Sequence, residues 1–350
     1  MVVLALGLLA VCSQLFSYPW VWAFPTAIGS NASFPASVVR SKPRPLVLWH
    51  GLGDSHSSPG MMKFADEVKA VHEGIFVYSI YIAEDLEEDR KAGWLGNIND
   101  QLATVADQLN AIEELKDGFD AIGFSQGGQF LRAYVERYNS PPIHNLITFG
   151  SQHMGVSDLP MCEPGPGYIW CQLARRAARN GVYGAWAQAN LIQAQYYRDP
   201  DQLPAYLSRN HFLPNVNNEL PEDYGLSGTS TAPTTERNAT YATNLKSLNK
   251  FIMVLFTEDK TVVPKESSWF GSYAPTDSLG TVERNQGQVI LAEKTIIPMR
   301  LQPVYMTDAI GLRSLDERGD VLLETCEGEH MQITRLCWKG LVNEWVGGPM

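Results

Sequence analysis

Phe119-Asp120-Ala121-Ile122-Gly123-Phe124-Ser125-Gln126-Gly127-Gly128 is the most informative stretch of this chain. Residues 119–124 predict a buried β-strand, and the residues after the stretch predict an α-helix. A Gly-x-Ser-x-Gly pattern between a buried strand and a helix is typical of a nucleophile elbow, a sharp turn that exposes a serine hydroxyl. Glycine permits such a turn because it has no Cβ atom. Ser125 is therefore a candidate nucleophile, with a structural glycine-rich turn as the alternative.

Apolar runs on both sides of this stretch alternate with helical patterns, which predicts an α/β fold with a mostly parallel sheet flanked by helices. Further strands are expected at 46–50, 75–80, 145–150, 251–256 and 321–323. The alternation stops at residues 156–246, which are rich in proline, glycine and aromatic residues and have helical but little strand character. We interpret this segment as a largely helical cap inserted into one domain that spans residues 40–350.

A reactive serine needs an imidazole base, and the base needs a carboxylate that fixes its tautomer. After a nucleophile elbow, the acid and then the histidine follow along the chain, each in a loop after a strand. Asp259 follows one predicted strand and His330 follows the last one, so we predict a catalytic triad of Ser125, Asp259 and His330. Asp308 is the alternative acid. His153 is the alternative base, although chain order disfavours it.

Attack on a carbonyl also requires hydrogen-bond donors for the developing oxyanion. In this architecture, one donor is the backbone amide after the nucleophile, and the other lies in the loop after an early strand. These positions predict the amides of Gln126 and Leu52, the latter within the loop His50-Gly51-Leu52-Gly53. An ordinary glycine-rich turn is the alternative for this loop. The chemistry needs no metal ion and no organic cofactor.

Composition and charge narrow the class of protein. Of 350 residues, 45% are hydrophobic and 19% are charged, which is typical of a folded globular chain. The net charge of −11 repels phosphate backbones, so we expect no nucleic-acid partner.

The beginning of the chain predicts entry into the secretory pathway. The apolar run Val2–Cys12 is too short to cross a bilayer but fits the core of a signal peptide, for which we predict residues 1–23. We expect no transmembrane segment. Sequons at Asn31 and Asn238 are candidate glycosylation sites in that pathway. The alternative is a cytosolic protein with a buried N-terminal helix.

Four cysteines lie outside the predicted signal peptide, and they allow three disulfide pairings. Proximity favours Cys162 with Cys171 and Cys326 with Cys337. Four reduced, buried thiols are the alternative. The spacing of the cysteines disfavours a zinc site.

Four stretches, PLVLWHGLGD (45–54), GFSQGGQFLR (123–132), QHMGV (152–156) and SWFG (268–271), resemble the palmitoyl-protein thioesterases, lysosomal enzymes of the α/β-hydrolase superfamily. The resemblance implies the α/β-hydrolase fold and places the triad on Ser125, Asp259 and His330. It also implies that fatty acyl groups, palmitate in particular, are removed from cysteine thioesters of proteins or peptides. Two rivals remain: an oxygen-ester lipase or esterase, and a non-catalytic secreted lipid-binding module.

The resemblance extends to covalent features and to the compartment. Cys162 with Cys171 and the sequon at Asn238 correspond to the family, whereas Cys326 with Cys337 is particular to this chain. A lysosome, a vacuole or the exterior is the expected destination. The aromatic residues of the inserted cap are expected to wall an acyl-binding groove: Trp170, Tyr183, Trp186, Tyr196 and Tyr197.

Overall fold

The computed structural model describes residues 42–158, 169, 181–226, 236–275 and 294–349. Residues 41–350 form one compact unit and residues 1–40 a separate one. The predicted signal peptide, the sequon at Asn31 and the pair Cys162 and Cys171 lie outside the described residues. Among the helices of the described residues, none is long and apolar enough to span a membrane.

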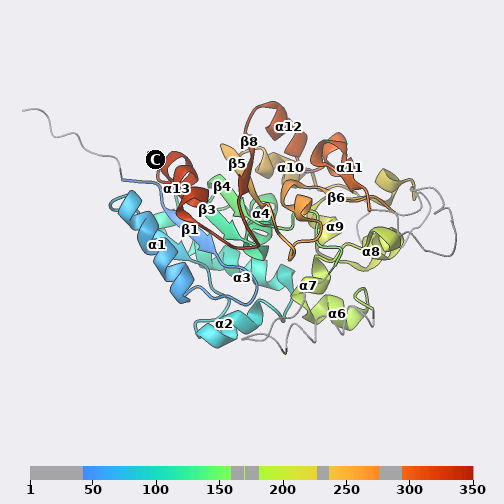
Figure 1. The fold of residues 1–350 in the computed structure, drawn as a ribbon, viewed down its shortest axis with the longest axis horizontal. Helices are drawn as coiled ribbons and strands as arrows, with labels where there is room; N and C mark the ends of the chain where they lie inside the picture. The colour runs from blue at the N-terminus through green and yellow to red at the C-terminus, as the bar shows by residue number, and fades with distance from the viewer. Residues whose placement is uncertain (1–41, 159–168, 170–180, 227–235, 276–293, 350) are drawn as a thin grey trace, which may run out of the picture. The chain divides into compact units, whose positions relative to one another are not determined.

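A parallel six-stranded sheet is the centre of the larger unit (Figure 1). Its order is β2-β1-β3-β4-β5-β8, and every neighbouring pair is parallel. The strands are β1 (Leu46–Trp49), β2 (Val77–Ser79), β3 (Phe119–Phe124), β4 (Ile143–Phe149), β5 (Lys250–Phe256) and β8 (Val321–Cys326). A short antiparallel pair, β6 (Ser272–Tyr273) and β7 (Ile296–Ile297), lies outside this sheet. The predicted α/β class is confirmed.

The strands bury both faces by alternation of their side chains. In β1, Leu46 and Leu48 point to one hydrophobic cluster, whereas Val47 and Trp49 point to the other. β8 is the exception, because it is an edge strand whose residues 323–325 are exposed. Exposed residues at a sheet edge need no apolar pattern, so the apolar run that predicts this strand ends at residue 323. The observed strand continues to Cys326.

Helices cover each face of the sheet. α1 (Pro59–Val71) and α13 (Arg335–Trp345) pack against one face, while α3 (Ile98–Asn110) and α4 (Gln126–Arg137) pack against the other (Figure 1). The N-terminus of α1 is set by Ser58, whose side chain accepts a hydrogen bond from the amide of Met61.

The remaining helices are short. The α-helices are α2 (Leu86–Ala92), α6 (Ala185–Asn190), α7 (Ile192–Gln195), α8 (Leu203–Arg209), α9 (Leu213–Val216), α10 (Ala239–Leu245), α11 (Pro303–Met306) and α12 (Leu312–Glu317). The 3₁₀ helices are η1 (Glu113–Leu115), η2 (Pro200–Gln202), η3 (Pro221–Tyr224), η4 (Lys265–Trp269) and η6 (Met299–Leu301).

The segment between β4 and β5 packs on the face of the sheet that α3 and α4 cover. Its short helices contribute apolar side chains to the same hydrophobic cluster as these two helices. Phe212, for example, meets Phe130 of α4 edge to face, with ring centroids 6.0 Å apart. α10, at the end of the segment, packs directly on α4. The described residues of this segment include α6, α7, α8, α9 and α10 and no strand.

Burial raises the pKa of two carboxyl groups in this unit, Glu136 and Asp120. Burial raises the pKa of Glu136, on α4, to about 7, although Arg132 beside it acts in the opposite direction. Burial also raises the pKa of Asp120, on β3, to about 6, against the effect of Arg44. Between the unfolded value near 4 and these values, the two carboxyl groups hold protons in the folded chain that they have lost in the unfolded chain. Their contribution to the free energy of unfolding therefore falls as the pH rises through this window.

Candidate active site

Ser125 lies in a sharp turn between β3 and α4. Its backbone has φ 52° and ψ −124°, an uncommon conformation for a residue other than glycine. A Cβ atom at Gly123 would lie 2.2 Å from the Cα atom of Gly128, and one at Gly127 would lie 2.4 Å from the carbonyl oxygen of Trp49. Both glycines are therefore required by the close approach of helix and strands. This is the geometry of a nucleophile elbow.

The structure brings Ser125, His330 and Asp259 together. The Nε2 atom of His330 is 3.0 Å from the hydroxyl oxygen of Ser125, and its Nδ1 atom is 2.6 Å from a carboxylate oxygen of Asp259. The three residues follow β3, β8 and β5, so they meet at the carboxyl end of the sheet. All three side chains are largely shielded from solvent.

Backbone groups fix the acid and make room for the imidazole. The second carboxylate oxygen of Asp259 accepts hydrogen bonds from the amides of Thr261 and Val262, at 2.8 and 2.9 Å. β4 lies between the strands that precede Ser125 and Asp259, and Gly150 follows it. A Cβ atom at Gly150 would lie 3.1 Å from the ring of His330. Glycine at this position lets the imidazole pass over the end of β4.

The two alternative residues are engaged elsewhere. Asp308 accepts hydrogen bonds from the amide and the hydroxyl of Ser314. His153 is fully buried, stacks on Phe270 with ring centroids 4.9 Å apart, and lies 3.1 Å from the hydroxyl of Thr148. Burial, assisted by nearby Arg132, holds the pKa of His153 well below its usual value. A neutral, enclosed imidazole in these surroundings has a packing role.

The two candidate oxyanion donors lie beside Ser125. Gln126 is the first residue of α4, and the first amides of a helix have no acceptor within it. The side chain of Gln126 is held by the carbonyl of Gly93 at 3.2 Å and the hydroxyl of Tyr196 at 3.2 Å. Leu52 follows β1 and lines the same cavity as Ser125. Gly51 has no Cβ atom, so this loop can approach Ser125 closely. A Cβ atom at Gly51 would lie 3.1 Å from the Cβ atom of Ser125.

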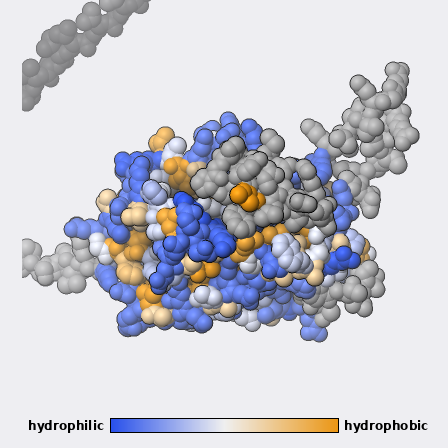
Figure 2. Space-filling model, turned by 90° about the horizontal axis from the view of Figure 1, so that it is seen from below, coloured by the Kyte–Doolittle hydropathy of each residue, from blue (hydrophilic) through white to orange (hydrophobic). Residues whose placement is uncertain are grey.

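A cavity of about 500 Å³ opens at Ser125 and His330, a volume typical of ligand sites. Apolar walls come from α1, from the chain after β8 and from the inserted segment: Met61, Phe64, Met331, Ile333, Trp338, Val156 and Tyr196. Figure 2 shows the molecule from below, where apolar residues reach the surface toward the side of α1 among hydrophilic ones.

The position of these walls differs from the sequence expectation. Of the aromatic residues expected in the groove, Tyr196 lines the cavity, Tyr183 and Tyr197 do not, and Trp170 lies outside the described residues. Trp186 does not line it either and is 64% exposed. The walls on α1 escaped prediction, although Met61 and Phe64 share one helix face directly after the candidate oxyanion loop. The groups that hold Asp259 are backbone amides, which any residue other than proline has, so the sequence does not reveal them.

A disulfide joins Cys326 to Cys337. It connects the end of β8 with α13, so the loop that carries His330 is tied to the fold at both ends. This is one of the pairs that proximity favours. Of the two sequons, the one at Asn238 lies within the described residues. Asn238 is exposed and caps α10 by accepting a hydrogen bond from the amide of Thr240.

The parallel sheet, the strained serine between strand and helix, and the order of serine, acid and histidine along the chain define an α/β-hydrolase. Residues 45–330 match the family model described as palmitoyl protein thioesterase. The chain belongs to this family, which confirms the resemblance seen in the sequence.

Three curated relatives illustrate the similarity. Palmitoyl-protein thioesterase 1 of Caenorhabditis elegans is 36% identical over 84% of this chain and 89% of its own length. Palmitoyl-protein thioesterase 3 of Dictyostelium discoideum is 29% identical over 83% of this chain and 86% of its own. The lysosomal thioesterase PPT2 homologue of Drosophila melanogaster is 27% identical over 80% of this chain and 83% of its own.

Proposed function

We propose that this protein hydrolyses the thioester between a long-chain fatty acyl group, palmitoyl in particular, and a cysteine of a protein or peptide. The observation that carries the proposal is the hydroxyl of Ser125 within 3.0 Å of His330 Nε2, at the head of an apolar cavity. Membership of the palmitoyl protein thioesterase family supports it.

In the acylation step, His330 takes the proton of Ser125 while the serine oxygen attacks the thioester carbonyl. Asp259 stabilises the imidazolium that forms, and the amides of Gln126 and Leu52 hold the oxyanion. Collapse of the tetrahedral intermediate breaks the carbon–sulfur bond. The cysteine leaves as a thiol after receiving the proton from His330, and the acyl group stays on Ser125 as an ester. A thiolate leaves more readily than an amine, so less assistance is needed than in a protease.

In the deacylation step, water takes the place of the thiol. His330 removes a proton from the water as its oxygen attacks the acyl-enzyme carbonyl, and then returns the proton to the oxygen of Ser125. The products are a fatty acid and the free serine. Every proton therefore passes through one imidazole.

The acyl chain occupies the cavity between α1 and the chain after β8. Each methylene buried there stabilises the complex by about 0.8 kcal/mol, so a long chain gains much more than a short one. The inserted segment 156–246 acts as a cap that adds Tyr196 to this cavity and leaves the acylated protein on the outside. An apolar wall makes no directional contacts with the acyl chain, so we expect selectivity to come from the length of chain that the cavity buries.

The names of relatives support a proposal for the compartment. We place this protein in the secretory pathway and then in the lysosome or vacuole, in line with the name of the Drosophila relative. The exposed position of Asn238 suits a glycan acquired on that route. Fractionation of the source cells, with a lysosomal marker followed in parallel, tests this placement.

Turnover of a palmitoyl thioester and of the matched palmitoyl oxygen ester tests the function. We expect faster hydrolysis of the thioester, and loss of both activities together with fluorophosphonate labelling in Ser125→Ala. Preference for the oxygen ester would make the protein a lipase or esterase. Absence of labelling and of turnover in the unmodified protein would leave a lipid-binding module.

A further inference from the structure

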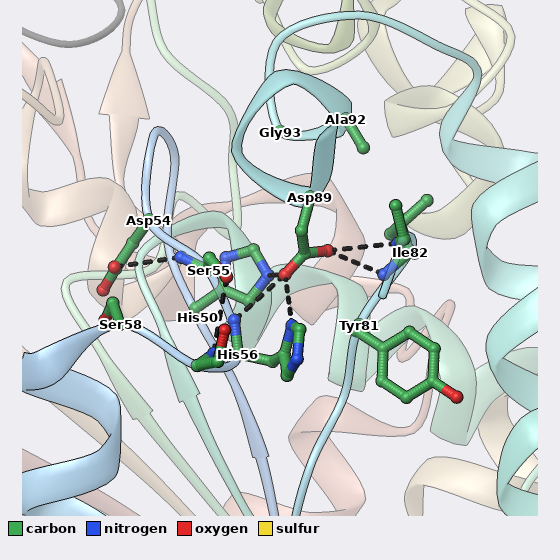
Figure 3. Close-up of polar contacts among 12 residues, drawn as sticks. His50, Asp54, Ser55, His56, Ser58, Tyr81, Ile82, Asp89, Ala92 and Gly93 are labelled. Carbon is green, nitrogen blue, oxygen red and sulfur yellow. Dashed lines mark hydrogen bonds and ion pairs between the residues drawn. The ribbon is translucent and has the colours of Figure 1, made fainter. Parts of the chain in front are cut away.

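Asp89 is a fully buried carboxylate that lies outside the triad and binds the loop before α1 (Figure 3). One of its oxygens accepts hydrogen bonds from the amide and the Nδ1 atom of His56, both at 3.0 Å, and lies 3.2 Å from Nε2 of His50. The other oxygen accepts a hydrogen bond from the amide of Ile82 at 2.8 Å. Burial would raise the pKa of Asp89, but its contacts with His50 and His56 outweigh burial and hold the pKa below its ordinary value.

The partners of Asp89 lie on both sides of the candidate oxyanion donor. His50 precedes Leu52 by two positions, and His56 follows it by four. One carboxylate on α2 therefore ties down both ends of the turn that carries the Leu52 amide. α2 also ends beside the second donor, because the carbonyl of Gly93 accepts a hydrogen bond from the side chain of Gln126 at 3.2 Å.

His50 lies between Asp89 and the backbone of its own loop. Its Nδ1 atom lies 3.0 Å from the carbonyl oxygen of Gly51, and its Nε2 atom is 3.2 Å from the carboxylate of Asp89. The ring is 3% exposed, so both contacts are shielded from solvent.

We propose that Asp89 is a positioning residue for the oxyanion hole: through His50 and His56 it holds the loop that places the Leu52 amide. The inference rests on the proposed function, because it assigns a role within that reaction. An oxyanion donor is effective only when it is in place before the charge develops. Asp89 never touches the substrate, and its contribution is made in the transition state.

Asp89→Asn tests the proposal, because each oxygen of this carboxylate accepts a hydrogen bond from a backbone amide, that of His56 or that of Ile82. An asparagine NH₂ group would therefore face a donor in either orientation. His50→Gln is the second variant, and it removes one of the two ties while keeping Asp89. Each variant is assayed for kcat and KM on a palmitoyl thioester, for inhibition by a long-chain trifluoromethyl ketone, and for inhibition by hexadecanol. The ketone forms an oxyanion on the serine, whereas hexadecanol only fills the cavity.

We expect kcat to fall about 10- to 100-fold in both variants with KM changed less than about twofold, as for a misplaced catalytic group. Affinity for the ketone falls by the same factor as kcat/KM, and affinity for hexadecanol does not change. Glu88→Gln is the matched control: it removes an exposed carboxylate from the same helix, paired only with Lys91, and leaves all values unchanged.

Two results would overturn the proposal. One is a kcat near that of the unmodified protein in a folded variant, and the other is an equal loss of affinity for the ketone and for hexadecanol, which indicates general disruption. If Asp89→Asn does not fold, His50→Gln decides by the same measurements. Failure of the unmodified protein to cleave the thioester would instead contradict the proposed function.

Discussion

Asp259→Asn provides the sharpest test of the triad, because the structure dictates how the new amide must lie. The amides of Thr261 and Val262 donate to one carboxylate oxygen at 2.8 and 2.9 Å, so the asparagine oxygen must take that place. The NH₂ group then takes the place of the carboxylate oxygen that lies 2.6 Å from Nδ1 of His330 in the unmodified protein. That nitrogen must become an acceptor, so the proton moves to Nε2 and points at Ser125. A histidine in this tautomer cannot accept the serine proton.

A wrong tautomer in a serine hydrolase costs about 10⁴ in kcat, or about 5 kcal/mol of transition-state stabilisation. We expect a loss of this size in Asp259→Asn, measured as initial turnover of a palmitoyl thioester at a pH where the unmodified protein is fully active. Asp308→Asn is the control, because asparagine tolerates the positive φ of that position and the carboxylate binds Ser314 of α12 rather than His330. A loss below tenfold in Asp259→Asn, or an equal loss in the control, would refute the reasoning.

Three further outcomes are expected. Lowering the pH from 7.5 to 5 raises the melting temperature of the unmodified protein relative to that of Glu136→Gln, since each pH unit in which Glu136 holds its proton only when folded adds about 1.4 kcal/mol. A difference in melting temperature between the two proteins that is the same at both pH values contradicts the assignment. Ile333→Trp fills part of the cavity and lowers kcat/KM for a palmitoyl thioester about tenfold relative to an octanoyl thioester, because about two fewer methylenes are buried. Leu336→Trp, at a 98% exposed position, leaves this ratio unchanged. Glycosidase treatment of protein from secretory cells lowers its mass, and Asn238→Gln removes the part of that change due to this site without loss of activity.

The fold and the meeting of the three side chains could be predicted because their signals are local. Residues 119–124 are apolar apart from Asp120, and glycines stand at 123, 127 and 128 around Ser125. A Cβ atom at any of these glycines would meet a neighbouring atom within contact distance. Chain order then points to Asp259 and His330, since strands that run parallel present their following loops at one edge. No long-range contact had to be known.

The cavity walls could not be predicted in the same way. Met61 and Phe64 lie far from Trp338 in the sequence, and they meet it only because α1 and α13 cover the same face of the sheet. The aromatic residues between β4 and β5 carry the stronger composition signal, yet Tyr183 is used for packing. Asp89 likewise looks like one of several acidic residues at the start of a surface helix, and only tertiary structure reveals that it is buried.

β4 has a consequence for how this protein can diversify. It is the strand between those that precede Ser125 and Asp259, it supplies no member of the triad, and it ends in a glycine that leaves the imidazole unobstructed. The long excursion of the chain starts just beyond it. We expect exchange of that segment to alter the part of the cavity wall that includes Val156 and Tyr196, while Ser125, Asp259 and His330 keep their places. The shape of this wall can then change in evolution independently of the three strands that position the reacting side chains.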